Sequence, residues 1–249
     1  RFSPLTRRHP SITSKLAPAV LIAVLLAVWQ LCSDLGVVPK FMLPSPTDVV
    51  TAFVEGFPAL MTHARVSLSE AFLGLGTAVI LSFVVAFLMD QFRVVREAVY
   101  PLLILTQTVP TVAIAPLLVL WLGYGILPKV VLIVITCFFP MTIGLLSGFA
   151  SADPDFIHMM RAMGASGWQI FRYVKLPSSA EQFFSGLRIS ASYSVVGAVI
   201  SEWLGGFEGL GVYMMRVKKS YAFDKMFAVI FLISIISLVL IKAVDLLKK

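Results

Sequence analysis

The feature that most constrains this chain is a series of long apolar stretches, each about as long as a helix that crosses a lipid bilayer. A membrane-spanning helix needs about 20 predominantly apolar residues. Six stretches of roughly this length occur, at 16–33, 66–89, 100–122, 127–149, 184–204 and 226–247. Only 13% of the residues are charged, about half the share of a typical soluble protein. The sequence therefore predicts an all-α polytopic membrane protein with about six transmembrane helices, organised as a single domain over residues 1–249.

The basic residues between these stretches predict the orientation of the chain. If the N-terminus is cytoplasmic, the cytoplasmic segments hold twelve of the 20 lysines and arginines, including Arg1, Arg7 and Arg8, and the outer segments hold seven, including Lys129. Arg188 lies within a stretch. Because short cytoplasmic loops carry an excess of Lys and Arg, we expect both termini in the cytoplasm. No small-residue cleavage motif follows the first stretch, so we expect it to remain as a helix.

The cysteines and histidines give no sign of a metal site or of an enzyme. Cys32 and Cys137 lie in separate apolar stretches and belong to no CxxC pair, which favours packing residues over metal ligands or a disulfide. His9 is in the N-terminal tail, and His63 and His158 are in predicted loops. We therefore expect no catalytic residue and no metal in this chain.

The segment 151–178 is too polar to span a membrane and carries the signals of two short helices. Asp153 can cap the first helix, and Gly164 can end it in a left-handed conformation. Ser166 and Gln169 have the spacing of a capping box for the second helix. The segment is predicted to fold as a helix–turn–helix.

Pro177 is predicted to end the second of these helices, because proline has no backbone N–H and disfavours helical geometry in Leu176 before it. The first helix presents an apolar side formed by Phe156, Met159, Met160 and Met163. Methionine adapts its shape to a partner surface, so this side can dock into a groove of a soluble protein. The alternative is that it covers the ends of the protein's own helices.

A helix is predicted between the first two stretches, either lying at the outer membrane interface or as an ordinary short loop helix. Ser45 can cap it, Pro46 suits its first turn and Asp48 favours its positive N-terminal end.

The loop resembles the cytoplasmic signature of binding-protein-dependent importer permeases of the ATP-binding-cassette (ABC) class, E-A-A-x3-G-x9-I-x-L-P. Gly164, Leu176 and Pro177 match it in identity and spacing, and Val174 stands where isoleucine is usual. His-Met-Met at 158–160 replaces Glu-Ala-Ala. Other motifs look like the nitrate, sulfonate and taurine branch of these permeases, namely 43–46, 110–117, 121–125 and 138–140. The stretch 193–205 is similar to permeases for thiamine-precursor pyrimidines.

This resemblance implies the MetI-like fold of type I ABC importers, with 151–178 as the coupling helix loop that enters a cytoplasmic ATPase. The residues that it assigns to ATPase coupling are Phe156, His158, Met159, Met160, Met163, Gly164, Ala165, Leu176 and Pro177. It implies as partners an ATPase dimer, a second permease copy, most simply as a homodimer, and an extracytoplasmic substrate-binding protein, but no nucleic acid. The place implied is the bacterial inner membrane. The sequence has no G-x-x-x-x-G-K-[ST] loop, so ATP and Mg²⁺ are expected on the partner and no cofactor on this chain.

Polar side chains within the apolar stretches are candidates for the translocation path, because such groups usually face a cavity or a bundle interior. The candidates are Gln107, Thr108, Thr111, Ser190, Tyr193, Ser194 and Glu202. Hydrogen bonding between helices is the alternative role, and Glu202 could belong to an outer gate or reach interfacial water. Pro110 and Pro116 are expected to break or kink their helix.

The expected solute is a thiamine-precursor pyrimidine or a related vitamin, and the alternative is taurine, an aliphatic sulfonate or nitrate. A different class, a secondary transporter driven by an ion gradient, would predict central charges and an inverted repeat. Neither is evident in the sequence.

Overall fold

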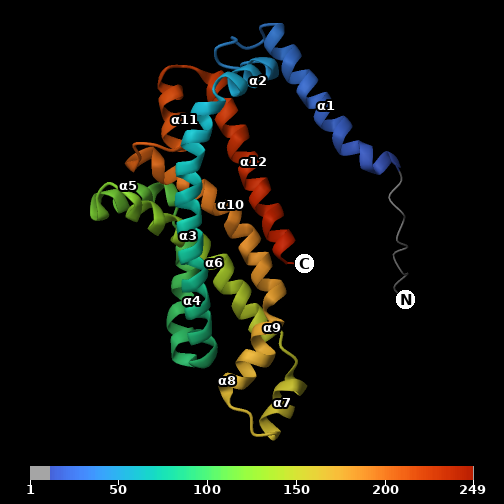
Figure 1. The fold of residues 1–249 in the computed structure, drawn as a ribbon, viewed down its shortest axis with the longest axis vertical. Helices are drawn as coiled ribbons and strands as arrows, with labels where there is room; N and C mark the ends of the chain where they lie inside the picture. The colour runs from blue at the N-terminus through green and yellow to red at the C-terminus, as the bar shows by residue number, and fades with distance from the viewer. Residues whose placement is uncertain (1–11, 249) are drawn as a thin grey trace. The chain divides into compact units, whose positions relative to one another are not determined.

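The computed structural model describes residues 12–248, which form helices joined by short turns, with no strand among them. The helices are α1 (Ile12–Asp34), α2 (Pro46–Glu55), α3 (Phe57–Gln91), α4 (Arg93–Thr108), α5 (Thr111–Leu122), α6 (Ile126–Ala150), α7 (Pro154–Ala162), α8 (Gly167–Ile170), a π-helical turn (Phe171–Lys175), α9 (Leu176–Ser178), α10 (Ala180–Gly205), α11 (Leu210–Lys219) and α12 (Phe223–Leu247) (Figure 1). The basic residues Arg1, Arg7 and Arg8, which contribute to the predicted orientation, lie outside the described residues.

Five of these helices are long and apolar enough to cross a membrane, namely α1, α3, α6, α10 and α12. The third predicted span is divided into α4 and α5, which meet at an angle of 105° and form either a broken span or a re-entrant loop. The break falls at Pro110, as predicted, because proline cannot donate the backbone hydrogen bond that would continue the helix. Pro116 lies inside α5 without ending it.

The described chain resolves into two compact units. One contains the described residues up to Phe57 together with Val217–Ala228, and the other contains Pro58–Arg216 and the residues from Val229 onward. The organisation as one domain stays a prediction.

The first unit is organised around the turn between α1 and α2. Ser33 donates a hydrogen bond to the carbonyl of Leu43 over 3.0 Å. The predicted cap of α2 is present as a full capping box, because the Asp48 amide donates to the Ser45 hydroxyl and the Ser45 amide donates to the Asp48 carboxylate. The ring of Trp29 packs 5.6 Å from that of Phe227. The capping box fixes where α2 starts.

In the second unit, α6 and α10 approach each other closely because glycines line their contact. A methyl group on Gly144 would lie 2.7 Å from the carbonyl oxygen of Gln182, and one on Gly186 would lie 2.5 Å from that of Pro140. Small residues allow this approach between membrane helices. The Ser190 hydroxyl donates to the Cys137 carbonyl, and the Cys137 thiol donates to the Ser190 carbonyl. Helices α6 and α10 therefore form a closely packed pair in the core of the second unit.

One predicted boundary and one predicted environment are wrong. α3 begins at Phe57 rather than near residue 66, so His63 lies within a helix and not in a loop. Lys129, predicted as an outer-loop charge, lies in the first turn of α6 and is 6% exposed. In both cases the polar side chain has its partner on a distant segment, since His63 accepts from the Gly209 amide and Lys129 pairs with Glu70 of α3.

Pro177 does not end the second loop helix. Leu176 keeps helical angles, with φ −63° and ψ −48°. The π-helical turn before it re-routes the backbone bonds, so that the Leu176 amide donates to the carbonyl of Phe171. Pro177 then occupies the first turn of α9, where a missing N–H costs no helical bond. As a result α10 begins at Ala180 and is longer than the predicted fifth span.

Candidate functional site: a projecting loop, a neutral pocket and a buried polar cluster

The loop between α6 and α10 lies at one end of the second unit, and α7 and α8 form its tip (Figure 1). Asp153 caps α7 by accepting a bond from the Asp155 amide over 2.9 Å. At the other end of α7, the Gly164 amide donates to Arg161 and the Ala165 amide donates to Met160. This is a Schellman motif, and it requires the left-handed conformation of Gly164, whose φ is +81°. The predicted turn is confirmed in its backbone detail.

The start of α8 is fixed in the same manner. The Ser166 hydroxyl accepts from the Gln169 amide, and the Gln169 side chain accepts from the Ser166 amide over 2.7 Å. The predicted capping box is confirmed. Together the two caps make the turn between α7 and α8 a defined structure rather than a flexible connection.

Large apolar side chains of α7 are left uncovered in this chain. Phe156 is 56% exposed, Met159 50% and Met163 78%. His158 and Pro177 are also exposed, whereas Met160, Ala165 and Leu176 are half-buried. A cluster of exposed apolar side chains on a polar loop is typical of a surface that contacts another protein. The role of these residues in coupling stays a prediction.

An aromatic cluster fastens the second loop helix to the bundle. Phe171 is buried and packs edge-on against Phe87 of α3 and Phe149 of α6, with ring centroids 4.7 Å and 5.2 Å apart. Trp168 stacks on Phe171 at 5.7 Å. Aromatic pairs of this kind add about 0.5–1.5 kcal/mol each beyond their buried area. Sequence reasoning did not identify this anchor, although the spacing of Trp168 and Phe171 by three residues indicates one helix face.

An ion pair reinforces the same junction. The Lys175 ammonium donates to both carboxylate oxygens of Asp90, at the end of α3, over 2.8 Å each. Both side chains are mostly buried. Lys175 was predicted only as a cytoplasmic charge. In the structure it ties the π-helical turn to α3, so that a displacement of the loop would be passed to the bundle.

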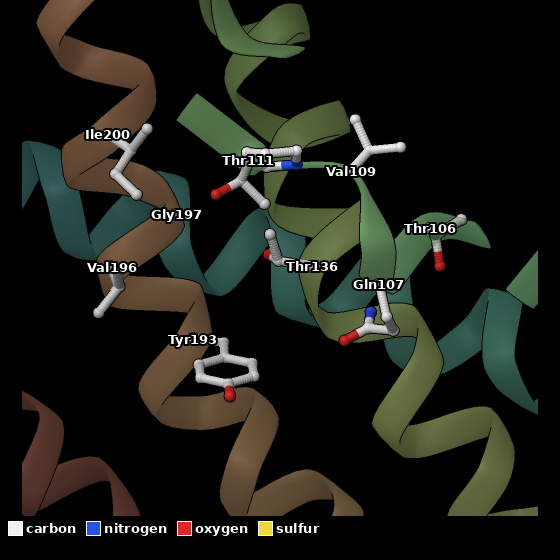
Figure 2. A pocket seen from close by; sticks show the side chains of 10 residues that line it. Thr106, Gln107, Val109, Thr111, Thr136, Tyr193, Val196, Gly197 and Ile200 are labelled. Carbon is white, nitrogen blue, oxygen red and sulfur yellow. The ribbon is translucent and has the colours of Figure 1, made fainter. Parts of the chain in front are cut away.

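A cavity of about 300 Å³ lies where α4 and α5 meet α6 and α10 (Figure 2). Its lining is neutral, and consists of Thr106, Gln107, Val109, Pro110, Thr111, Thr136, Tyr193, Val196, Gly197 and Ile200. The break between α4 and α5 creates this space, because the two helices turn aside at Pro110 instead of filling it.

The structure brings three predicted path residues into this cavity, namely Gln107, Thr111 and Tyr193. Thr108 is exposed and does not line it; its hydroxyl donates to the Leu105 carbonyl. Ser190 and Ser194 were predicted for the path but are fully buried, with their hydroxyls bonded to backbone carbonyls. Ser190 shows the alternative role, a hydrogen bond between helices, because its partner Cys137 is on α6. Ser194 bonds within its own helix, to Ala191.

Glu202 was also predicted for the path, yet it is 1% exposed and belongs to a separate cluster at the end of the unit opposite the loop. Its carboxylate accepts from the Ser67 hydroxyl and from the Gly211 amide, both over 2.6 Å. The Ser67 hydroxyl in turn accepts from the Leu210 amide over 2.8 Å. Glu202 therefore neither lines the cavity nor reaches water. It joins α3, α10 and the start of α11.

Two further groups complete this end of the unit. Glu70, one turn after Ser67, pairs with Lys129 of α6, and both side chains are 7% exposed. His63 accepts from the Gly209 amide over 3.1 Å, and Gly209 has a φ of +128°. We call Ser67, Glu70, Lys129, Glu202 and the 209–211 backbone the buried polar cluster. A signal for it was present in the sequence, since a carboxylate at Glu70 within an apolar stretch needs a buried cation.

With this geometry established, the family can be assigned. Residues 78–249 match the family described as binding-protein-dependent transport system inner membrane component. The chain belongs to this family, and is thus a membrane-spanning permease subunit of an ABC transporter. Membership implies an ATPase and a substrate-binding protein as partners. The alternative of a transporter driven by an ion gradient does not fit this assignment.

Similar proteins support the same class. The chain is 34% identical to a probable ABC transporter permease protein of Haemophilus influenzae, over 92% of this chain and 94% of the relative. It is also 34% identical to the formylaminopyrimidine transport permease protein ThiX of Halalkalibacterium halodurans, over 90% and 89%. Relatives at 29–30% identity are named as riboflavin, aliphatic sulfonate and taurine transport permeases. The crystal structure of an amino acid ABC transporter with histidines has the same fold, with a TM-score of 0.66 at 15% identity, over 80% of this chain and 96% of that chain.

Proposed function

We propose that this chain is the permease of an ATP-driven importer for a thiamine-precursor pyrimidine or a related vitamin, and that the loop 151–178 couples it to a cytoplasmic ATPase dimer. The observation that carries the coupling role is the pairing of a structured tip with uncovered apolar side chains on α7. A tip without these side chains would have nothing to bury in a partner.

The connection of the loop to the bundle supports its role as a mechanical link. Phe171 and Lys175 contact α3 on the bundle side of the loop, while Phe156 and Met163 remain uncovered at the tip. A displacement of the tip by the ATPase would thus be transmitted through packed side chains to the long helices. ATP and Mg²⁺ would bind to the partner, and no cofactor to this chain.

The remaining assignments follow from this role. The tip would face the cytoplasm, together with both termini, and the buried polar cluster would lie toward the outer side, where a binding protein delivers the solute. Two copies of the permease would enclose the path in the bacterial inner membrane. The neutral cavity beside Gln107 and Tyr193 is the segment of that path formed by this chain.

The name of the ThiX relative, at 34% identity, supports a pyrimidine as the solute. The relatives named for sulfonate and taurine transport, at 29–30% identity, support the alternative. A ligand screen on the cognate binding protein distinguishes these two classes of solute. Binding of a sulfonate and not of a pyrimidine would overturn the assignment of the solute.

The coupling role is tested by copurification. The permease with Phe156→Asp should insert normally but retain much less ATPase after purification in mild detergent, because an ion would have to be buried in an apolar groove. The matched control is Phe207→Asp, an 80% exposed phenylalanine in the turn between α10 and α11, outside the loop 151–178. Equal ATPase recovery with Phe156→Asp and with the unmodified chain would contradict the proposal.

A further inference from the structure

The neutral cavity contains an acceptor whose own proton is already used. The Thr136 hydroxyl donates to two carbonyls of its own helix, Ile133 at 2.8 Å and Leu132 at 3.2 Å. A hydroxyl has one proton and two lone pairs. Since the proton is engaged, the oxygen can only accept a hydrogen bond from a molecule in the cavity. Thr106 has the same arrangement, with its proton directed to the Leu103 carbonyl over 2.7 Å.

A glycine leaves the Thr136 oxygen uncovered. A methyl group on Gly197 of α10 would lie 3.3 Å from this oxygen. In the absence of that methyl group, the acceptor is open to the cavity between α6 and α10. Tyr193, one turn before Gly197, is 47% exposed, and Figure 2 shows its ring on the same side of α10, across the cavity from Gln107. The ring supplies a flat apolar wall and the Gln107 amide supplies both donors and an acceptor.

None of the residues that line the cavity is charged. An anion entering it would lose hydration without gaining a cationic partner, which is unfavourable. A neutral molecule with no N–H or O–H group would offer no hydrogen-bond donor to the lone pairs of the Thr136 and Thr106 oxygens. Both kinds of molecule are therefore disfavoured by the lining itself.

We infer that the cavity selects a neutral, planar solute that carries N–H or amino donors, and that Thr136 and Thr106 are specificity-determining residues. This inference rests on the proposed function, in which the helices of this chain form the path. It adds that the permease itself discriminates between solutes, in addition to the binding protein, and that a sulfonate is disfavoured within the membrane.

The test measures binding to the purified permease–ATPase complex without a binding protein, by equilibrium dialysis. The probes are 4-aminopyrimidine, 4-dimethylaminopyrimidine, which lacks the amino donors, and ethanesulfonate. The unmodified complex should prefer the amino compound over the dimethylamino compound by about three- to tenfold, the effect of one to two hydrogen bonds. Ethanesulfonate should bind more weakly than either.

Thr136→Val keeps the shape of the side chain and removes the acceptor, so it should abolish most of the preference between the two pyrimidines. The matched control is Thr77→Val, because the Thr77 hydroxyl makes the same kind of bond, to the Leu73 carbonyl over 2.8 Å, but lies on an exposed part of α3. Gly197→Ala should weaken binding of the amino compound by covering the Thr136 oxygen. Its control is Gly76→Ala, where no atom lies within 4 Å of the added methyl group.

The inference is overturned if neither pyrimidine binds, if ethanesulfonate binds as tightly as 4-aminopyrimidine, or if Thr136→Val leaves the preference unchanged. An assembled complex that hydrolyses ATP but shows any of these results refutes only the inference. A chain that does not associate with an ATPase refutes the proposed function instead.

Discussion

The two ends of the second unit differ in what they expose and what they bury. At the loop end, α7 leaves Phe156, Met159 and Met163 uncovered on a structured tip. At the opposite end, the buried polar cluster hides Glu70, Lys129 and Glu202 and satisfies most of their hydrogen-bonding groups within the chain. The loop end therefore leaves apolar surface uncovered within this chain. At the opposite end, hydrogen bonds and an ion pair connect the helices of the chain to one another.

This difference indicates where each end gains its stability. The cross-links of the buried polar cluster join α3, α6, α10 and α11 through polar bonds that are strong because water is excluded. The tip depends on backbone caps and on the junction formed by Phe171 and Lys175. Substitutions should accordingly destabilise the bundle at one end, and affect mainly partner binding at the other.

The largest effect is expected for Lys129→Met. It leaves the Glu70 carboxylate buried without a cation, which should lower the free energy of unfolding by about 3–5 kcal/mol. Thermal unfolding in detergent measures this change. The double variant Lys129→Met with Glu70→Leu should recover most of the loss, because both charges are then absent. A double variant less stable than the single one would show that the ion pair is not the cause.

Glu202→Leu should have the next largest effect. It removes the acceptor for the Ser67 hydroxyl and the Gly211 amide, at a cost of about 2–3 kcal/mol. Hydrogen exchange at the Gly211 amide should accelerate, since this amide loses its carboxylate partner. Glu202→Gln keeps one acceptor oxygen, so its stability should lie between that of Glu202→Leu and that of the unmodified chain. If exchange at the Gly211 amide is unchanged in Glu202→Leu, the Glu202 carboxylate does not hold the start of α11 in the buried polar cluster.

Gly164→Val tests the tip. No neighbouring atom lies within 4 Å of an added Cβ, so the effect arises from the backbone φ of +81° alone. The strain should be about 1–2 kcal/mol, small for the whole protein but sufficient to disrupt the turn before α8. Solute uptake in proteoliposomes should fall while thermal unfolding changes little. Gly167→Ala, in the same loop without a positive φ, is the control. Normal uptake with Gly164→Val would show that the left-handed turn at Gly164 is not needed for transport.

The smallest effect concerns the two capping boxes, which differ in one group. The box of α2 contains Asp48, whose pKa is lowered by hydrogen bonds from the Ser45 side chain and backbone. A carboxyl with a lowered folded-state pKa stabilises the protein fully above its unfolded value near 3.8, and this contribution is lost as the pH falls through the folded value. The box of α8 contains Gln169, which does not titrate in this range.

The protection of amides at the start of α2, relative to their intrinsic exchange rates, should therefore fall on acidification below about pH 3.8, whereas protection at the start of α8 should lack this step. Asp48→Asn should remove the pH dependence at α2. Equal responses of the two helix starts would show that titration of Asp48 does not control the cap.

The sequence was informative wherever local chemistry determines structure. Caps at Ser45, Asp153 and Ser166, the left-handed Gly164 and the break at Pro110 all follow from interactions within a few residues of the chain. The family could also be predicted from the sequence, because its signature is a contiguous motif in the loop.

What the sequence did not reveal depends on contacts between distant segments. Ser67 and Glu202 are 135 residues apart, and Asp90 and Lys175 are 85 apart. Nothing near Lys129 marks it as buried, because its partner is on another helix. Pro177 was misjudged for a related reason, since its effect depends on the π-helical turn before it. Of the predicted path residues, Gln107, Thr111 and Tyr193 line the cavity. Ser190, Ser194 and Glu202 are buried elsewhere, and Thr108 is exposed outside the cavity.

The sharp turn between α4 and α5 has a consequence for how this scaffold can change its cargo. Helix ends present side chains and free backbone groups to a space that continuous helices would occupy. Residues 106–111 lie on a short elbow outside the close α6–α10 contact. Under the proposed function, a substitution there would alter the chemistry that the solute meets without disturbing the glycines of the α6–α10 contact. One bent segment would thus let the cavity lining change while the surrounding framework is retained.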